Sequence, residues 1–119
     1  MKRNFRKEGK EAEELAVEYL QHRGYSIVER NYRFSKKGEI DIIARDGEYL
    51  VFCEVKSRSD EEFGPPEYAL TPLKQRTIRR TAEAYLALKH IQDQACRFDV
   101  VAIRLVEGRP VLTLLKNAF

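Results

Sequence analysis

The feature of this sequence that most constrains its fold is a pair of apolar runs that carry charges where an ordinary core strand has none. The runs are residues 38–43 and 51–56, and Asp46-Gly47 lies between them. Asp-Gly between two alternating apolar segments predicts a β-hairpin, because a tight primed turn needs positive φ angles that these residues adopt readily. The chain is therefore expected to contain a sheet with charges placed on its faces.

The turn sets the register of this hairpin. If Asp46 and Gly47 form the turn, paired residue numbers sum to 93, so Asp41 lies opposite Phe52. Because side chains alternate between faces, one face carries Glu39, Asp41, Ile43, Leu50, Phe52, Glu54 and Lys56, and the other is a core face of Ile40, Ile42, Ala44, Val51, Cys53 and Val55. Asp41 and Glu54 are then diagonal neighbours at roughly 7 Å. A three-residue loop would instead place Glu54 on the opposite face.

Asp41, Glu54 and Lys56 on one face are the residue types that hold a divalent metal beside a phosphodiester. Carboxylates crowded across strands repel one another unless a cation lies between them. Mg²⁺ or Mn²⁺ suits such a site because both ions prefer oxygen ligands. Lys56 can orient the attacking water or stabilise charge on the phosphate. The alternative is a solvated sheet surface with an ion pair between Glu54 and Lys56, and the whole pattern favours the metal site.

A helix over residues 7–23 is predicted by apolar residues that recur at the 3.6-residue period. This stripe consists of Ala12, Leu15, Ala16, Tyr19 and Leu20. Glu13 lies at its edge, where a carboxylate can lean over the charged face as a further ligand, whereas Glu14 points away. Alternatively, Glu13 is a boundary residue in water or paired with a nearby Lys.

A second helix is expected to begin at Thr71-Pro72, with a capping Thr and a Pro in its first turn. Gln75 lies in the same row as the apolar Ala82, and a buried amide needs a hydrogen-bond partner. The metal site or a bound phosphate would supply one. The alternative is that the first turn overhangs the core and Gln75 is solvated.

The expected layout is a helix, a strand over residues 25–34, the hairpin, a second helix, and strands over residues 98–106 and 111–115. This is an α/β fold with a central mixed sheet, an antiparallel hairpin and flanking helices. The 119 residues, 43% hydrophobic and 34% charged, suit one domain over residues 1–119. No apolar run is long enough to span a membrane, so a cytoplasmic location is expected.

Charge is unevenly distributed along the chain, which favours a nucleic-acid partner. Residues 38–73 hold three Lys/Arg against nine Asp/Glu, whereas residues 74–90 hold five against one. An acidic middle between basic segments suits a metal site among surfaces that attract phosphate. The candidate contacts are Arg33, Lys36, Lys37, Arg58, Lys74, Arg76, Arg79 and Arg80. Solvated basic faces are the ordinary alternative. The long segment 57–70 is a candidate substrate clamp, or an insertion that contacts a second copy.

Motifs over nearly the whole chain resemble the YraN-like family of predicted bacterial endonucleases, within the restriction-endonuclease-like, or PD-(D/E)xK, superfamily. Holliday-junction resolvases are more distantly similar in shape. The matching residues are Gly9, Glu13-Glu14-Leu15-Ala16, Gly24-Tyr25, Asn31, Gly38-Glu39-Ile40-Asp41, residues 51–58, Phe63-Gly64, Pro72, Lys74-Gln75 and residues 97–101. The resemblance implies a restriction-endonuclease-like fold, with Glu13 as the helix carboxylate of the site.

The function expected from the residues and the resemblance is metal-dependent hydrolysis of phosphodiester bonds, in DNA rather than RNA, with branched or repair intermediates as one kind of substrate. Asp41, Glu54 and Glu13 would hold Mg²⁺ or Mn²⁺, with Lys56 and Gln75 assisting. Two alternatives are a nucleic-acid-binding module without catalysis and a protein-interaction domain. A homodimer is a further expectation, because cutting both strands usually takes two symmetry-related sites.

Overall fold

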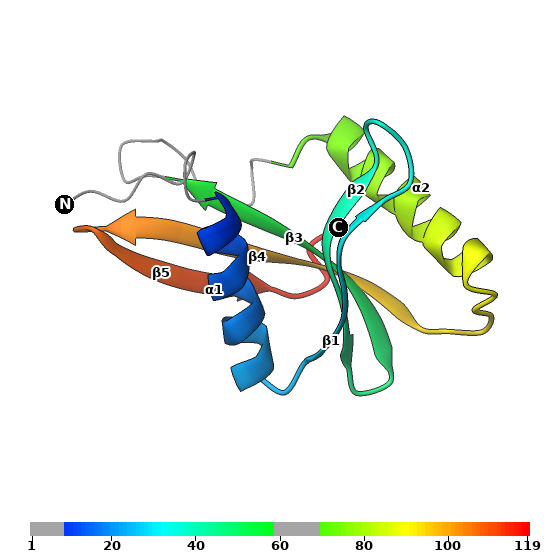
Figure 1. The fold of residues 1–119 in the computed structure, drawn as a ribbon, viewed down its shortest axis with the longest axis horizontal. Coiled ribbons are helices and arrows are strands. Elements are labelled where there is room, and N and C mark those ends of the chain that lie inside the picture. Colours follow the sequence, from blue (N-terminus) through cyan, green and yellow to red (C-terminus); the bar gives the residue numbers. More distant parts are fainter. Residues whose placement is uncertain (1–8, 59–69) are drawn as a thin grey trace.

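The structure, a computed structural model, describes residues 9–58 and 70–119. Along the chain the elements are α1 (Gly9–His22), β1 (Ser26–Arg33), β2 (Glu39–Asp46), β3 (Tyr49–Arg58), α2 (Pro72–Leu88), β4 (Cys96–Val106) and β5 (Arg109–Leu115) (Figure 1). The predicted order of one helix, three strands, a second helix and two strands is confirmed. Most of the segment expected to clamp substrate, including Phe63-Gly64, lies outside the described residues.

The five strands form one mixed sheet in the order β1-β2-β3-β4-β5. Neighbouring strands are antiparallel except β3 and β4, which run parallel. Parallel neighbours need a long crossover connection, and α2 lies within the connection between them. The fold is therefore an α/β arrangement in which the predicted hairpin forms the middle of the sheet.

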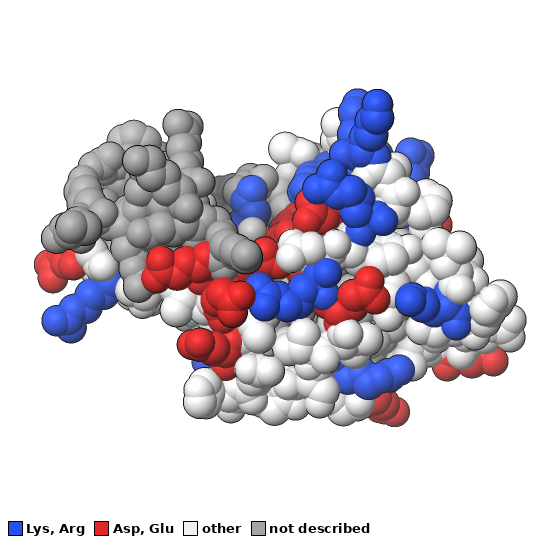
Figure 2. Space-filling view, in the orientation of Figure 1, with Lys and Arg blue, Asp and Glu red and all other residues white. Residues whose placement is uncertain are grey.

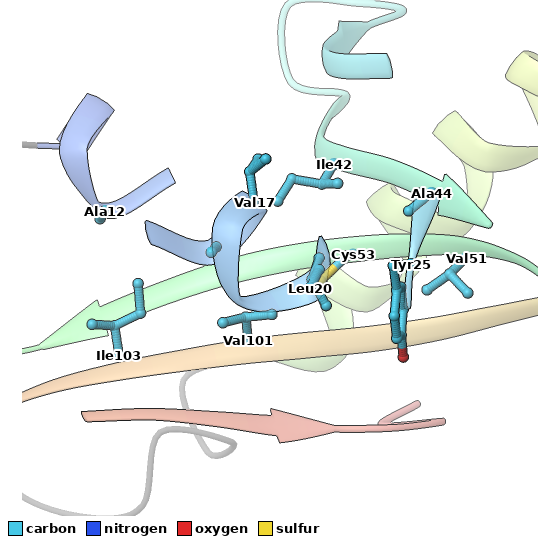
Figure 3. Packing of buried hydrophobic residues seen from close by; sticks show 11 residues of the cluster. Ala12, Val17, Leu20, Tyr25, Ile42, Ala44, Val51, Cys53, Val101 and Ile103 are labelled. Atoms are coloured by element: carbon cyan, nitrogen blue, oxygen red, sulfur yellow. The ribbon is translucent and has the colours of Figure 1, made fainter. Parts of the chain in front are cut away.

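Helix α1 covers one face of the sheet (Figure 3). Its buried residues Ala12, Ala16 and Leu20 pack with most of the β2 and β3 residues predicted for the core face, and with Val101 and Ile103 of β4. The core-face residues in this cluster are Ile42, Ala44, Val51 and Cys53. Gly24, with φ of +89°, follows the helix at the point where a left-handed residue ends it. Neither helix in the described part of the chain is long and apolar enough to cross a membrane.

Helix α2 covers the opposite face, so both faces of the hairpin are buried. The second core cluster joins Ile78, Ala82 and Tyr85 of α2 to Ile43, Leu50 and Phe52 of the hairpin. The sheet face expected to be charged is thus apolar where α2 covers it. It is acidic only at the end that carries Asp41 and Glu54. The helix begins as predicted, with the Thr71 side chain accepting a hydrogen bond from the Lys74 N–H at 3.1 Å and Pro72 as its first residue.

The turn of the hairpin is one residue later than predicted. Asp46 pairs with Tyr49, so Gly47 and Glu48 form the turn and paired numbers sum to 95 instead of 93. This changes the register by two residues. Each side chain of the paired segment therefore stays on its predicted face, because side chains alternate with a period of two. Asp46 stays in the strand because its carboxylate accepts a hydrogen bond from Arg97 at 2.8 Å. The expected pairing of Asp41 with Phe52 is therefore wrong, since Phe52 pairs with Ile43.

β2 separates from β3 close to its beginning, where the candidate site lies. The β2–β3 pairing runs from Asp46 only to Ile42, while β2 remains paired with β1 as far as Glu39. Beyond Ile42 the alternation breaks, and Ile40 joins the α2-side cluster, although it was predicted to share a core face with Ile42 and Ala44. The strand end carrying Asp41 is thus displaced from its neighbour, and a side chain there can enter the space between two strands.

A buried polar network fixes the opposite end of β2, away from the candidate site. Asp99, fully buried on β4, accepts hydrogen bonds from the Tyr25 hydroxyl at 2.9 Å, from the Arg97 guanidinium at 2.8 Å and from the Asn117 N–H at 3.0 Å. Arg97 also donates to Asp46. Asp99 thus holds the Arg97 guanidinium in place beside Asp46.

Candidate functional site

Asp41 lies where β2 and β3 part, and its side chain completes the hydrogen bonding of β3. The carboxylate Oδ2 accepts a hydrogen bond from the main-chain N–H of Val55 at 2.8 Å. In a regular ladder a main-chain carbonyl would accept that proton. Because the bond is short, it fixes the carboxylate of Asp41 beside β3.

Glu54 is the buried partner of Asp41. Continuing the observed register by one residue brings the two residues level, and the side chain of Glu54 is only 6% exposed. Burial, together with the hydrogen bond and the charge of Asp41, raises the pKa of Glu54 well above its usual range. Two neighbouring carboxyl groups disfavour each other's ionisation, and this effect of Asp41 adds to the larger effect of burial on the pKa of Glu54.

Lys74 of α2 partly offsets the charge of this pair. Its Nζ lies 3.4 Å from Oε2 of Glu54, and it lowers the pKa that burial raises. The ion pair is not aligned as a hydrogen bond, so Oε2 has no hydrogen-bond partner among the described residues. The sequence placed Lys74 only among nucleic-acid contacts. The predicted helix start already put it one turn into α2, which is the signal that could have found its role.

Lys56 lies two residues beyond Glu54 in the same strand. The β3–β4 pairing continues without interruption through Lys56 and on to Arg58, so alternation places Lys56 on the face of Glu54. Its side chain is half-buried, and Arg58 at the end of the strand is buried. The register thus places the three residues of the hairpin motif, Asp41, Glu54 and Lys56, at one end of the β2–β3 pair.

Glu13 approaches the pair from α1, on the opposite side of the sheet from α2. Burial first, and then the charge of Asp41, raise the pKa of Glu13, while Arg30 and a hydrogen bond from Asn31 lower it. Its Oε1 is buried without a hydrogen-bond partner in the described structure, and the Arg30 Nε lies 4.0 Å away. Glu14 is exposed and pairs with Arg30 at 3.1 Å, as its outward direction predicted.

Asn31 of β1 lies beside Asp41 and Glu13 and has an unusual backbone conformation. It has a φ of 54°, a left-handed conformation that is rare inside a strand but more accessible to Asn than to most residues. The β1–β2 register places Asn31 level with Asp41. Asn31 was not predicted to have a role at the site, although an Asn in the middle of a predicted strand is itself a signal of irregular backbone.

The Gln75 side chain has a different hydrogen-bond partner from the one expected. The side chain is half-buried, and its Nε2 donates a hydrogen bond to the main-chain oxygen of Leu70 at 3.2 Å. The partner that a buried amide requires is therefore the segment entering α2. Its assistance in catalysis remains a prediction without a contact to the carboxyl pair.

Of the eight predicted basic contacts, Arg58 is buried, and the other seven divide into two groups. Arg33 pairs with Glu39 at 3.0 Å, Lys74 pairs with Glu54, and the Arg79 guanidinium stacks 4.7 Å over the Phe98 ring. The exposed residues Lys36, Lys37, Arg76 and Arg80 form the second group. Figure 2 shows Lys and Arg side chains gathered over the β1–β2 turn and the adjoining part of α2, beside a group of acidic side chains.

The chemistry of the donors fits a hard divalent cation. No three Asp, Glu, His or Cys side chains within residues 9–58 and 70–119 converge as a complete ion site. The neighbouring carboxyls of Asp41 and Glu54, with buried oxygens on Glu54 and Glu13 that have no hydrogen-bond partner among the described residues, supply the oxygen donors that Mg²⁺ or Mn²⁺ prefers. Mg²⁺ usually keeps several waters and is held by one or two carboxylates together with substrate phosphates, so a complete set of protein ligands is not needed.

Fold and site together define an α/β protein with a carboxyl pair where two central strands separate. Residues 12–103 match the model of uncharacterised protein family UPF0102, and the chain belongs to that family. It is 50% identical over 112 residues to a UPF0102 protein of Geotalea uraniireducens, covering 93% of this chain and 87% of that protein. It is 41% identical over 115 residues to a UPF0102 protein of Dehalococcoides mccartyi, covering 97% and 94%. These names assign no activity.

Proposed function

We propose that the protein is a metal-dependent nuclease of the restriction-endonuclease-like type, which hydrolyses phosphodiester bonds in DNA. The observation that carries the proposal is the carboxylate of Asp41, held by the Val55 N–H at 2.8 Å where β2 leaves β3, beside the buried Glu54 whose pKa it helps to raise. A stable fold gains nothing from two carboxyls in contact, because each disfavours ionisation of the other. A site that holds a cation needs this arrangement.

Asp41, Glu54 and Glu13 would hold Mg²⁺ or Mn²⁺. When bound, the ion activates water and offsets negative charge on the phosphate. The bond from Val55 keeps the Asp41 carboxylate in place before the ion arrives, so little reorganisation is needed. Lys56 would orient the attacking water or stabilise the charge that develops on the phosphate.

The surroundings of the pair support a polyanionic substrate. Lys36 and Lys37 in the β1–β2 turn and Arg76 and Arg80 on α2 are exposed, and none of them has an acidic partner within 4 Å in the described structure. Basic side chains beside an acidic site attract phosphate. A bound metal ion would reduce the repulsion between the carboxylates and that phosphate.

The proposal is tested with full-length protein, labelled duplex and single-stranded DNA, and Mg²⁺ or Mn²⁺. Asp41→Asn is the sharpest variant, because an Asn oxygen can still accept the Val55 proton while the charge is lost. We expect Asp41→Asn and Lys56→Met each to lose about 100-fold or more in cleavage rate. Glu48→Gln in the hairpin turn and Lys89→Met beyond α2 are matched controls and should cleave like the wild type.

Cleavage that persists unchanged in Asp41→Asn or Lys56→Met contradicts the proposal, since a contaminating nuclease would behave in that way. The rival function is a nucleic-acid-binding module without catalysis. It predicts salt-sensitive DNA binding that needs no metal and no cleavage by the wild type. Absence of both binding and cleavage would leave the protein-interaction domain.

A further inference from the structure

The turn between β1 and β2 presents an aromatic ring to solvent in a basic setting. Phe34 is 56% exposed. Among the exposed large hydrophobic residues of the described structure, it is the most exposed aromatic one. Lys36 and Lys37 follow it and are exposed. An exposed Phe in a turn gains no burial energy, whereas a polar residue there would be solvated without cost. The ring is therefore suited to a ligand.

This turn is held rigidly against α2. The Phe34 N–H donates to the Gly38 oxygen at 2.9 Å, and the Gly38 N–H donates to the Ser35 hydroxyl at 3.1 Å. Gly38 approaches α2 so closely that a Cβ there would lie 2.5 Å from Oγ1 of the buried Thr81. A ring on an anchored turn loses little conformational freedom when it binds, which favours its use in recognition.

The turn also lies close to the carboxyl pair. Asn31 is level with Asp41 in the β1–β2 register, and Phe34 follows it by three residues. Three residues of extended strand span about 10 Å. A nucleic acid with a phosphate at Asp41 and Glu54 would therefore extend to the ring within a few nucleotides.

We propose that Phe34 stacks on an unpaired base, so that the substrate is DNA with a single-stranded segment beside the bond to be cut. Bases in a duplex are already stacked on both sides, whereas an unpaired base has a free π-face for the ring. The positive charge of Lys36 and Lys37 suits the adjacent phosphates and disfavours an apolar protein partner. The inference rests on the proposed nuclease function for the substrate it names.

The test is DNA binding without divalent metal, measured by fluorescence anisotropy on a single strand, a duplex with a single-stranded flap, and a perfect duplex. The wild type should favour the first two. Phe34→Ala should weaken those two roughly fivefold to a hundredfold, since one stacked base contributes about 1–3 kcal/mol, and should leave the duplex unchanged. Phe34→Tyr should restore binding, and Phe34→Leu should not. The double variant with Lys36→Ala and Lys37→Ala should weaken all three.

A fluorescent adenine analogue, 2-aminopurine, in the flap reports stacking directly, and its quenching should depend on an aromatic residue at 34. Equal binding of all three DNAs by the wild type, or equal losses on all three in Phe34→Ala, overturns the inference. The nuclease proposal is judged separately with Mg²⁺. Cleavage lost in Asp41→Asn but insensitive to base pairing retains the nuclease and rejects the ring contact. Binding that depends on the ring, without any cleavage, retains the ring contact and rejects the nuclease.

Discussion

The side chain of Asp41 takes the place of a strand neighbour for Val55, accepting its main-chain N–H at 2.8 Å where β2 has already turned away from β3. One carboxylate thereby serves the fold and faces Glu54 at the same time. This dual use means that charge and hydrogen bonding at Asp41 can be separated by mutation.

Asp41→Ala and Asp41→Asn should differ in stability. Ala leaves the Val55 N–H without its acceptor, at a cost of about 1–3 kcal/mol, whereas Asn retains an acceptor and removes a charge beside Glu54. Urea unfolding of the metal-free proteins measures the difference. Equal stability of the two variants would show that the Val55 bond contributes nothing.

Glu54→Gln should stabilise the metal-free protein, and increasingly so as pH rises. The folded-state pKa of Glu54 lies above the usual value of 4.5, so the folded protein binds the extra proton and loses stability as pH rises from 4.5 toward the raised value. The difference in unfolding free energy should grow by up to about 1.4 kcal/mol per pH unit. Thermal unfolding in EDTA at several pH values, with Glu48→Gln as control, measures it. A pH-independent difference would mean that Glu54 is ionised in the folded protein.

Asn31→Ala should be less stable than Asn31→Gly by about 1 kcal/mol. Both variants lose the contact with Glu13, so the comparison isolates the backbone, which has a φ of 54°. A left-handed conformation costs Ala roughly 1–2 kcal/mol and Gly little, although Gly gives up part of that gain through its freer unfolded chain. The midpoints of denaturant unfolding of the two variants measure this difference in stability. A more stable Ala variant would contradict the left-handed conformation.

Much of the fold could be predicted because its signals are local. The apolar period of α1, the cap at Thr71 and the alternation in the hairpin each specify an element within one segment. The faces of the hairpin survived a wrong turn, since a shift of two residues preserves alternation. The exact pairing could not be predicted, because Asp46 is held in the strand by Arg97, 51 residues further along the chain.

The candidate site was predicted less fully, for a related reason. Asp41, Glu54 and Lys56 stand in one local pattern, whereas the departure of β2 from β3 and the approach of Lys74 depend on how α2 packs. The face of Asp41 was argued from a regular ladder that in fact ends at Ile42. The prediction for Gln75 depends on its helical position alone, whereas its partner Leu70 lies in the segment before α2.

Arg97→Met should destabilise the protein strongly without weakening the candidate cation site. The substitution leaves Asp99, which is fully buried, without its ion-pair partner, and breaking such a pair costs about 3–5 kcal/mol. Lys116→Met removes an exposed partner of Asp46 at 3.5 Å and should cost less than about 1 kcal/mol. Chemical unfolding compares them. A small effect of Arg97→Met would show that the network is not needed for the fold.

The most direct test of the account is calorimetric titration of Mn²⁺ into metal-free wild-type protein and Asp41→Asn, with Asp93→Asn as a matched control in an exposed loop. The carboxyl pair predicts one ion bound per chain in the wild type and in Asp93→Asn. It also predicts affinity lowered about tenfold or more in Asp41→Asn, because one of the charged ligands is lost. Equal Mn²⁺ affinity in the wild type and Asp41→Asn, or no binding to the wild type, would contradict the claim that Asp41 and Glu54 form a cation site.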